Sequence, residues 1–135
     1  MDCVFCKIVV GAIPSYKIYE NDHTLAFLDI NPVSPGHTLV ISKKHYSNLE
    51  DIPEKELCEM IKTVKKVGKA LKDGLGVEGY NILKNNDPVA GQIIPHNHFH
   101  VVPRKKDDNL SQWPQDKYKE GEADNISKKI IKNIN

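Results

Sequence analysis

The stretch from Pro95 to Pro103, PHNHFHVVP, places three of the six histidines of this chain at alternate positions. Residues i, i+2 and i+4 of a β-strand point to one face, so His96, His98 and His100 should form a row with neighbours roughly 6.5–7 Å apart. A helix would scatter the same side chains around its axis. Aligned imidazoles suit metal binding, or proton and phosphoryl chemistry near neutral pH. The alternative is a solvated strand with histidines. The opposite face would carry Asn97, Phe99 and Val101.

Length and charge limit the class of protein. A chain of 135 residues fits one domain that buries its own core. A net charge of +1 argues against bulk electrostatic binding of nucleic acid. No apolar run reaches ~18 residues, so we expect no membrane span, and the N-terminal residues do not form a signal pattern. We therefore predict a cytoplasmic protein with reduced thiols. An odd count of three cysteines is a poor disulfide framework.

A Cys-x-x-Cys motif lies at Cys3 and Cys6, within a segment that reads as a short helix or turn ended by Gly11 and Pro14. Such a motif in a cytosolic protein is redox-active or metal-binding. A redox motif of the thioredoxin type should follow a strand and open a long helix, and this one does neither. Zinc is the better interpretation if two further ligands exist, and an unligated thiol pair is the alternative.

Hydrophobic periodicity predicts five strands and one long helix. The strands are expected at 16–20, 24–30, 37–42 and 80–85 and at the histidine stretch, and the helix at 53–75. We expect Cys58 to be a buried thiol beside the apolar stripe of the helix and its lysines to be solvated. A second helix is expected at 124–134, and the tail around it could pack on a partner subunit or cover the sheet. The apolar stripe of the long helix consists of Leu57, Met60, Ile61, Val64, Val67, Gly68, Leu71 and Leu75.

Three polar features, Asp29, His45 and the loop 86–92, give weak signals when they are taken alone. Asp29 could accept hydrogen bonds from sugar hydroxyls or serve as a turn residue before Asn31-Pro32, and spacing alone favours the turn. His45 follows two lysines and looks like a surface residue. The loop 86–92 could hold a phosphate through backbone N–H groups, although it matches no Walker pattern.

The segment from His96 to Val102, HNHFHVV, resembles the signature of the histidine triad (HIT) superfamily, with Asn97 in place of the usual apolar first spacer. The resemblance covers residues 3 to 104 and is strongest to small bacterial members related to nucleoside phosphoramidases. Further blocks in the family's usual order are FCKI at 5–8, LDINP at 28–32, PGHTLVI at 35–41, and Asn85 with AGQ at 90–92.

This resemblance implies an α+β fold, in which a five-stranded antiparallel sheet carries one long helix and short terminal helices. It implies a HIT domain at 1–106 followed by a C-terminal tail at 107–135. It also implies a homodimer that holds a nucleotide in a cleft on the sheet beside the histidines.

The resemblance implies an enzyme, a hydrolase that cleaves purine nucleoside 5′-monophosphate adducts (AMP or GMP) of the phosphoramidate type. His98 would be the nucleophile and would form a nucleotidyl-histidine intermediate. His100, aided by Gln92, would stabilise the phosphoryl oxygens, and His37 would orient or relay protons behind the site. The nucleotide-binding residues implied are Phe5, Ile8, Phe27, Asp29, Ile30, Asn85, Gly91 and Gln92, with His98 and His100.

A structural zinc follows from the same resemblance. Its implied ligands are Cys3, Cys6, His45 and His96, a closed Cys₂His₂ set. This gives His96 a role different from that of His98.

Two alternatives for function remain. One is a dinucleoside polyphosphate hydrolase or nucleotidyltransferase, in which Arg104 would accept a longer polyphosphate. The other is a nucleotide-sensing or scaffold protein with incidental activity, which would not need the nucleophile His98. Ile93 stands where many family members carry Ser or Thr, so a hydroxyl that would help to protonate a leaving amine is missing.

Overall fold

The computed structural model describes residues 2–134. Its elements are α1 (Val4–Val9), β1 (Lys17–Glu20), β2 (Thr24–Leu28), β3 (Thr38–Ser42), α2 (Glu54–Leu75), β4 (Gly79–Leu83), the 3₁₀ turn η1 (Pro88–Ala90), β5 (His98–Arg104) and α3 (Glu122–Ile131).

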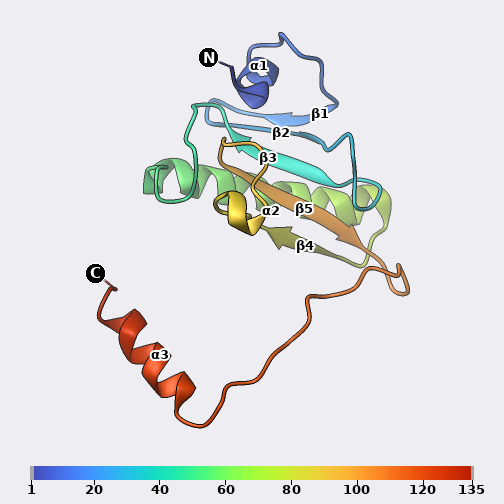
Figure 1. Ribbon diagram of the computed structural model, residues 1–135. Coiled ribbons are helices and arrows are strands. Elements are labelled where there is room, and N and C mark those ends of the chain that lie inside the picture. The colour runs from blue at the N-terminus through green and yellow to red at the C-terminus, as the bar shows by residue number, and fades with distance from the viewer. Residues whose placement is uncertain (1, 135) are drawn as a thin grey trace.

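The five strands form one sheet in the order β1-β2-β3-β5-β4, and every neighbouring pair is antiparallel. In the centre of the sheet, β3 and β5 pair with Leu39 opposite His100 and Ile41 opposite His98. β1 and β4 are the edges (Figure 1). The predicted α+β fold, a five-stranded antiparallel sheet with one long helix, is confirmed.

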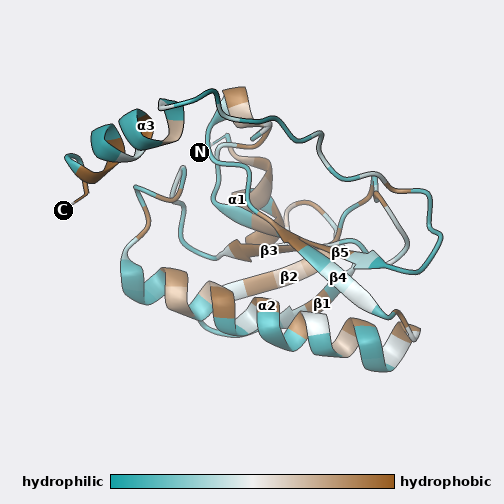
Figure 2. Ribbon diagram, turned by 90° about the horizontal axis from the view of Figure 1, so that it is seen from below, coloured by the Kyte–Doolittle hydropathy of each residue, from teal (hydrophilic) through white to brown (hydrophobic). Residues whose placement is uncertain are grey.

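Helix α2 packs on one side of the sheet and α1 lies on the other (Figure 2). Acidic residues in the first turn of α2 suit its dipole, and Gly76 ends the helix in the left-handed conformation, with φ 66°. Two predictions for α2 are wrong. Ile61 and Leu75 are 47% and 52% exposed, and Cys58 is exposed, because the buried stripe is narrower than the sequence suggested. The stripe consists of Met60, Thr63, Val64, Val67, Gly68 and Leu71.

The two faces of the sheet have separate cores. Ala26, Val40, Phe99 and Val101 pack against α2. On the opposite face, Leu25, Phe27, Leu39 and Ile41 pack together with Phe5 of α1. Because side chains alternate along a strand, β5 gives Phe99 and Val101 to the first core and turns His98 and His100 to the α1 side.

Only two of the three histidines predicted in one strand lie in β5, because this strand begins at His98. His96 lies in a bend before the strand, where its backbone N–H donates to the carbonyl of Ile94 at 2.8 Å. Its Nε2 atom lies 2.7 Å from the carbonyl oxygen of Ser42, and its ring packs edge-on against Phe5, as the ring of His98 does. The second strand is also shorter than predicted. It ends at Leu28, so Asp29 and Ile30 lie in the following loop.

The chain beyond Arg104 leaves the sheet as an extended segment that ends in α3. None of the residues of α3 is buried, and the segment does not cover the sheet of its own chain (Figures 1 and 2). Within residues 2–134, no helix has the length and apolar character needed to cross a membrane.

Candidate active site

A cavity of about 520 Å³ lies on the α1 side of the sheet. It is bordered by α1, the end of β2, the loop that follows β2, the loop before β5, and the start of β5. Of the ten residues predicted to bind nucleotide, nine line it, which brings together segments from residue 5 to residue 100. These nine are Phe5, Ile8, Phe27, Asp29, Ile30, Asn85, Gly91, His98 and His100, and His37 lines the cavity as well.

The ring of His98 is held in one tautomer. Its Nδ1 atom lies 2.6 Å from the carbonyl oxygen of His96, and a carbonyl accepts hydrogen bonds only, so Nδ1 carries the proton. Nε2 of the neutral ring therefore keeps its lone pair. Phe5 packs edge-on against this ring at 5.1 Å between centroids, which limits its rotation. The arrangement presents an unprotonated imidazole nitrogen, the form needed for nucleophilic attack.

His37 and His100 form a second fixed pair. The backbone N–H of Val33 donates to Nδ1 of His37 at 3.0 Å, so neutral His37 carries its proton on Nε2. That Nε2 lies 2.9 Å from Nδ1 of His100, to which it donates. His100 must then carry its own proton on Nε2. The result is an N–H donor on His100 beside the acceptor nitrogen of His98, with the two rings 5.1 Å apart.

Burial keeps these rings neutral. Desolvation lowers the pKa of His37 and of His98 below the ordinary value and lowers that of His100 to about 4. A neighbouring carboxylate, Asp29, opposes the shift, but burial is the larger effect. At neutral pH, the tautomers assigned above are therefore the populated forms.

Asp29 makes the turn contact that spacing alone favoured, and it also lines the cavity. Its Oδ1 accepts from the backbone N–H of Asn31 at 2.8 Å, which is the turn role. Its Oδ2 lies 3.7 Å from Nε2 of His37, and the residue lines the cavity. A carboxylate can accept several hydrogen bonds, so the turn leaves capacity for hydroxyl groups of a ligand.

Gln92 is the predicted nucleotide-binding residue that the structure does not bring to the cavity. It is buried, and its amide holds the loop instead. Nε2 donates to the carbonyls of Ser47 and Ile94 at 2.6 and 3.1 Å, and Oε1 accepts from the backbone N–H of Asp87 at 2.8 Å. Gln92 therefore fixes the path of the loop that brings Asn85 and Gly91 to the cavity.

The four predicted metal ligands meet beside the cavity, with their donor atoms within 4.8 Å of one another. Nδ1 of His96 lies 3.5 Å from Sγ of Cys3 and 3.6 Å from Sγ of Cys6, and Nδ1 of His45 lies 3.4 Å from Sγ of Cys6. Tetrahedral zinc with ordinary Zn–S and Zn–N bonds places sulfur and nitrogen ligands roughly 3.6 Å apart. The spacing therefore fits a tetrahedral ion.

Protonation and hydrogen bonding in this cluster also fit zinc. The Nε2–H group of His96 donates to the Ser42 carbonyl at 2.7 Å and leaves the Nδ1 lone pair for a metal. Burial raises the pKa of the Cys6 thiol, and the nearby Cys3 raises it further. Two thiolates held this close need a cation between them, which a bound metal would supply.

Lys84 is a polar neighbour of the site that the sequence did not single out. Its Nζ donates to the carbonyl of Asn85 at 3.2 Å. Its charge lowers the pKa of His98 and of His100, and burial lowers its own pKa. A cation near the two histidines favours a phosphate there. One sequence signal was a basic residue directly after the apolar pair Ile82-Leu83. Further residues that line the cavity but were not predicted from the sequence include Val4, Ile13, Pro14, Leu39 and Ile94.

Comparison with known proteins assigns the chain to a family. The model of the HIT domain family matches residues 10–107. The chain belongs to the HIT domain family. Within it, the chain is 55% identical over 106 residues to an uncharacterized HIT-like protein of Methanocaldococcus jannaschii, covering 78% of this chain and 81% of that one.

Two further relatives have named activities. The chain is 44% identical over 110 residues to an adenosine 5′-monophosphoramidase of Candida albicans, covering 76% of this chain and 70% of the relative. It is 45% identical over 109 residues to an adenylylsulfatase of Arabidopsis thaliana, covering 81% of this chain and 55% of the relative.

Solved HIT structures superpose closely. A HIT family protein of Bacillus subtilis has a TM-score of 0.91 at 39% identity and covers 100% of this chain and 99% of its own. A Streptococcus mutans protein has a TM-score of 0.91 at 38% identity, with coverage of 99% and 86%. A zinc-bound histidine triad family protein of Mycobacterium smegmatis has a TM-score of 0.80 at 41% identity, with coverage of 85% and 84%.

Proposed function

We propose that this protein is a nucleotide hydrolase that cleaves purine nucleoside 5′-monophosphate adducts through a nucleotidyl intermediate on His98. The observation that carries the proposal is the hydrogen bond from Nδ1 of His98 to the His96 carbonyl at 2.6 Å. It leaves Nε2 as a nucleophile in a cavity of about 520 Å³, a size that suits one small ligand. Relatives named as a monophosphoramidase and an adenylylsulfatase support this reaction class.

The reaction divides into two displacements at phosphorus. In the first, Nε2 of His98 forms a bond to the α-phosphorus while the bond to the leaving group breaks, and the leaving group takes up a proton from solvent. In the second, water attacks phosphorus and releases a proton to solvent, the N–P bond breaks with its electron pair returning to Nε2 of His98, and the nucleoside monophosphate leaves. The Nε2–H of His100, held outward by His37, donates to a phosphoryl oxygen in both steps. Asp29 binds the ribose hydroxyls, and Phe5 and Phe27 contact the base.

Zinc has a structural role in this proposal. Cys3, Cys6, His45 and His96 would hold the ion, which would link α1 to the segments before α2 and β5. Bound zinc would supply this cross-link and would take no part in the reaction at His98 and His100. The zinc-bound relative from Mycobacterium smegmatis supports the presence of a metal in the family.

The leaving group is the finer part of the proposal. Ile93 lines the cavity and is 87% exposed, so the loop offers no hydroxyl there to protonate a departing amine. This favours a leaving group that departs without help from a proton donor, such as sulfate. The polyphosphate alternative has less support, because the Arg104 guanidinium is bound to Asp108 and to Asn81 and does not line the cavity.

The test is turnover of a panel of adenosine and guanosine 5′-phosphate adducts that differ only in the leaving group. An amidate, a sulfate anhydride and a dinucleoside tetraphosphate cover the three classes. We expect release of the nucleoside monophosphate, with the tetraphosphate the poorest substrate. A panel without turnover, in protein that binds a nucleoside monophosphate, would favour the nucleotide-sensing alternative. We also propose a homodimer, which light scattering would test.

A further inference from the structure

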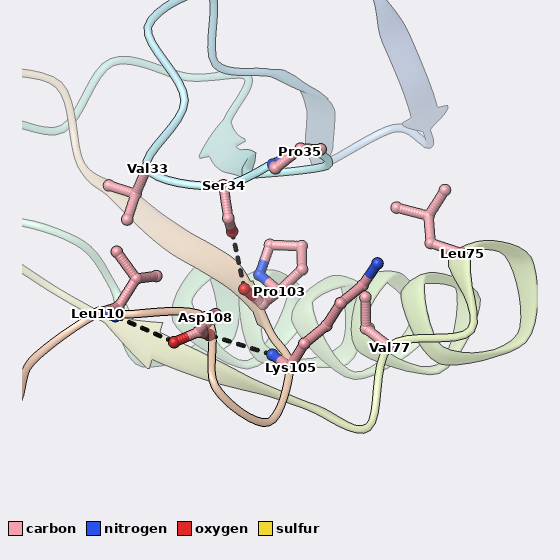
Figure 3. A pocket seen from close by; sticks show the side chains of 9 residues that line it. All are labelled: Val33, Ser34, Pro35, Leu75, Val77, Pro103, Lys105, Asp108 and Leu110. Carbon is pink, nitrogen blue, oxygen red and sulfur yellow. Dashed lines mark hydrogen bonds between the residues drawn. The ribbon is translucent and has the colours of Figure 1, made fainter.

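A second pocket, here called the end pocket, lies where α2 and β5 end and has a volume of about 320 Å³ (Figure 3). Among the described residues, only Val33 lines both this pocket and the histidine-lined cavity. The volume is at the lower end of the range for small-molecule sites, ~300–1,000 Å³. The lining is mostly apolar and comprises Val33, Pro35, Leu75, Val77, Pro103 and Leu110, with three polar residues beside them.

One wall of the end pocket is the turn at residues 104–110, which one arginine holds in shape. The Arg104 guanidinium bonds Asp108 through Nε at 2.7 Å and through Nη2 at 3.1 Å, and Nη2 also donates to the Leu110 carbonyl at 3.0 Å. Nη1 donates to Oδ1 of Asn81 on β4 at 2.7 Å. Bidentate arginine–carboxylate pairs fix direction as well as distance. This wall is therefore preformed.

The same turn leaves one charge of the end pocket without a partner. Both oxygens of Asp108 are occupied by Arg104 and by the backbone N–H groups of Lys105 and Leu110, the latter two at 3.1 Å. Within residues 2–134, the Lys105 ammonium has no hydrogen-bond or ion-pair partner, and in Figure 3 its side chain extends toward Leu75. An apolar pocket with one unpaired cation is complementary to an anion that has an apolar body.

The end pocket is also joined to the loop that follows β2. Ser34 lines the pocket, and its hydroxyl donates to the Pro103 carbonyl at 2.7 Å (Figure 3). Gly36, with φ 94°, lets the loop lie directly on the end of α2, because a Cβ atom there would lie 2.6 Å from Cδ1 of Leu75. The position of this loop therefore depends on the residues that form the pocket.

Val33 connects the end pocket to the histidines. Its side chain is 54% exposed and lines both hollows. Its backbone N–H donates to Nδ1 of His37 at 3.0 Å, the contact that makes Nε2 of His37 a donor to His100. A ligand that packs on Val33 would therefore contact the residue that sets the tautomers of this pair.

We propose that the end pocket is a regulatory site for a small carboxylate with an apolar chain or ring. The carboxylate accepts hydrogen bonds from Lys105, and the apolar part packs on the apolar lining. A single ammonium balances the one charge of a carboxylate, whereas a phosphate group carries about −1.5 to −2 at pH 7. Contact with Val33 restricts the loop and favours the arrangement in which His37 donates to His100. The regulatory role rests on the proposed function, and the site itself does not.

The test of the site is an NMR titration of the full chain with octanoate, with octanamide and acetate for comparison. We expect octanoate to bind with a Kd of roughly 0.1–1 mM, as is usual for a ligand of about ten heavy atoms. Octanamide lacks the charge and should bind about tenfold more weakly, and acetate lacks the chain and should not bind at these concentrations. Methyl signals of Leu75 and Val77, in the end pocket, should shift, and those of Ile8 and Ile94, in the histidine-lined cavity, should not.

A matched pair of variants tests the role of the charge. Lys105→Met and Lys106→Met remove the same charge from adjacent exposed residues, and of the two only Lys105 lines the pocket. Octanoate should bind about tenfold more weakly to Lys105→Met, because a hydrogen bond to a charged group is lost, and equally well to Lys106→Met. Melting temperatures equal to that of the wild type would show that both variants fold.

The regulatory role has a readout of its own. The ¹⁵N signals of the His37 and His100 rings should shift as octanoate saturates the wild type. AMP should bind at least about fivefold more tightly to the octanoate complex, and by linkage octanoate should bind the AMP complex more tightly by the same factor. Both effects should be lost in Lys105→Met at octanoate concentrations that do not saturate this variant.

The outcomes separate the site from its role. Absence of octanoate binding, or shifts at Ile8 and Ile94 in place of Leu75 and Val77, would overturn the site, and equal affinity in Lys105→Met would overturn the ligand class. Bound octanoate that leaves the ring signals and the AMP affinity unchanged would overturn the regulatory role. Failure of the hydrolase would show separately, as a substrate panel without turnover in protein that binds AMP.

Discussion

Nε2 of His37 lies 2.9 Å from Nδ1 of His100, and the backbone N–H of Val33 fixes which of the two nitrogens carries the proton. One hydrogen bond from the loop after β2 thus determines the tautomer of a histidine in β5, more than sixty residues away in sequence. The proposed reaction needs His100 as a donor and His98 as an acceptor. Main-chain groups, and not the histidines alone, impose that difference.

The neutral state of His100 makes stability depend on pH. Burial lowers its pKa to about 4, against an ordinary value near 6.5 in the unfolded chain. Between these values the unfolded state binds more protons, so stability is lost as the pH falls from 6.5 towards 4. Denaturant midpoints at pH 7.5, 6 and 5 should show this fall, and His100→Gln should reduce the slope. An identical slope in both proteins would mean that His100 is not held neutral by the fold.

Asp29 is expected to act in binding more than in chemistry. Asp29→Asn keeps an oxygen for the Asn31 N–H and so preserves the turn, but it removes the charge that ribose hydroxyls would use. Charge-assisted hydrogen bonds of this type contribute roughly 1.5–3 kcal/mol, so KM should rise about 10–100-fold with kcat little changed.

A control for Asp29 uses 2′,3′-dideoxyribose substrates. The wild type should discriminate against them, and Asp29→Asn should not. If both proteins discriminate equally, Asp29 serves the turn alone.

One zinc per chain is the expected metal content, which elemental analysis of protein purified without chelator will measure. The proposed ligands Cys3 and Cys6 flank Phe5, whose ring packs on His98. A six-residue helix such as α1 is too short to persist by itself. Cys3→Ser/Cys6→Ser should therefore lose zinc, lose protection of α1 in hydrogen exchange, and bind nucleoside monophosphate more weakly. Zinc well below one per chain in the wild type would contradict the site.

Asn97 is a source of instability in the core. It is fully buried, its Oδ1 has no hydrogen-bond partner, and its Nδ2 meets only Sδ of Met60 at 3.5 Å. A buried unsatisfied polar atom costs roughly 1–3 kcal/mol. Asn97→Val should raise the free energy of unfolding by about that range in chemical denaturation, with turnover unchanged. A less stable variant would imply that a buried water completes the site.

The sequence was sufficient for the sheet, the long helix and the identity of most cavity residues, because these follow from periodicity and from motifs. The position of His96 could not be read from its spacing, since the Ser42 carbonyl and the bend at Ile94 decide it. Gln92 looked like a ligand-binding residue, yet contacts to Ser47 and Asp87 occupy its amide. Such contacts join segments far apart in the chain, and no local pattern reports them.

The nucleophile itself is the central claim. His98→Ala should lose at least ~10³-fold in turnover and should still bind a nucleoside monophosphate, because the base and ribose contacts lie elsewhere. The most direct measurement is an acid-free rapid quench of the wild type with a nucleotide adduct labelled in the nucleoside, followed by mass analysis of the modified peptide. The account predicts a nucleotidyl group on His98. A label on His100, or turnover of His98→Ala near that of the wild type, would contradict it.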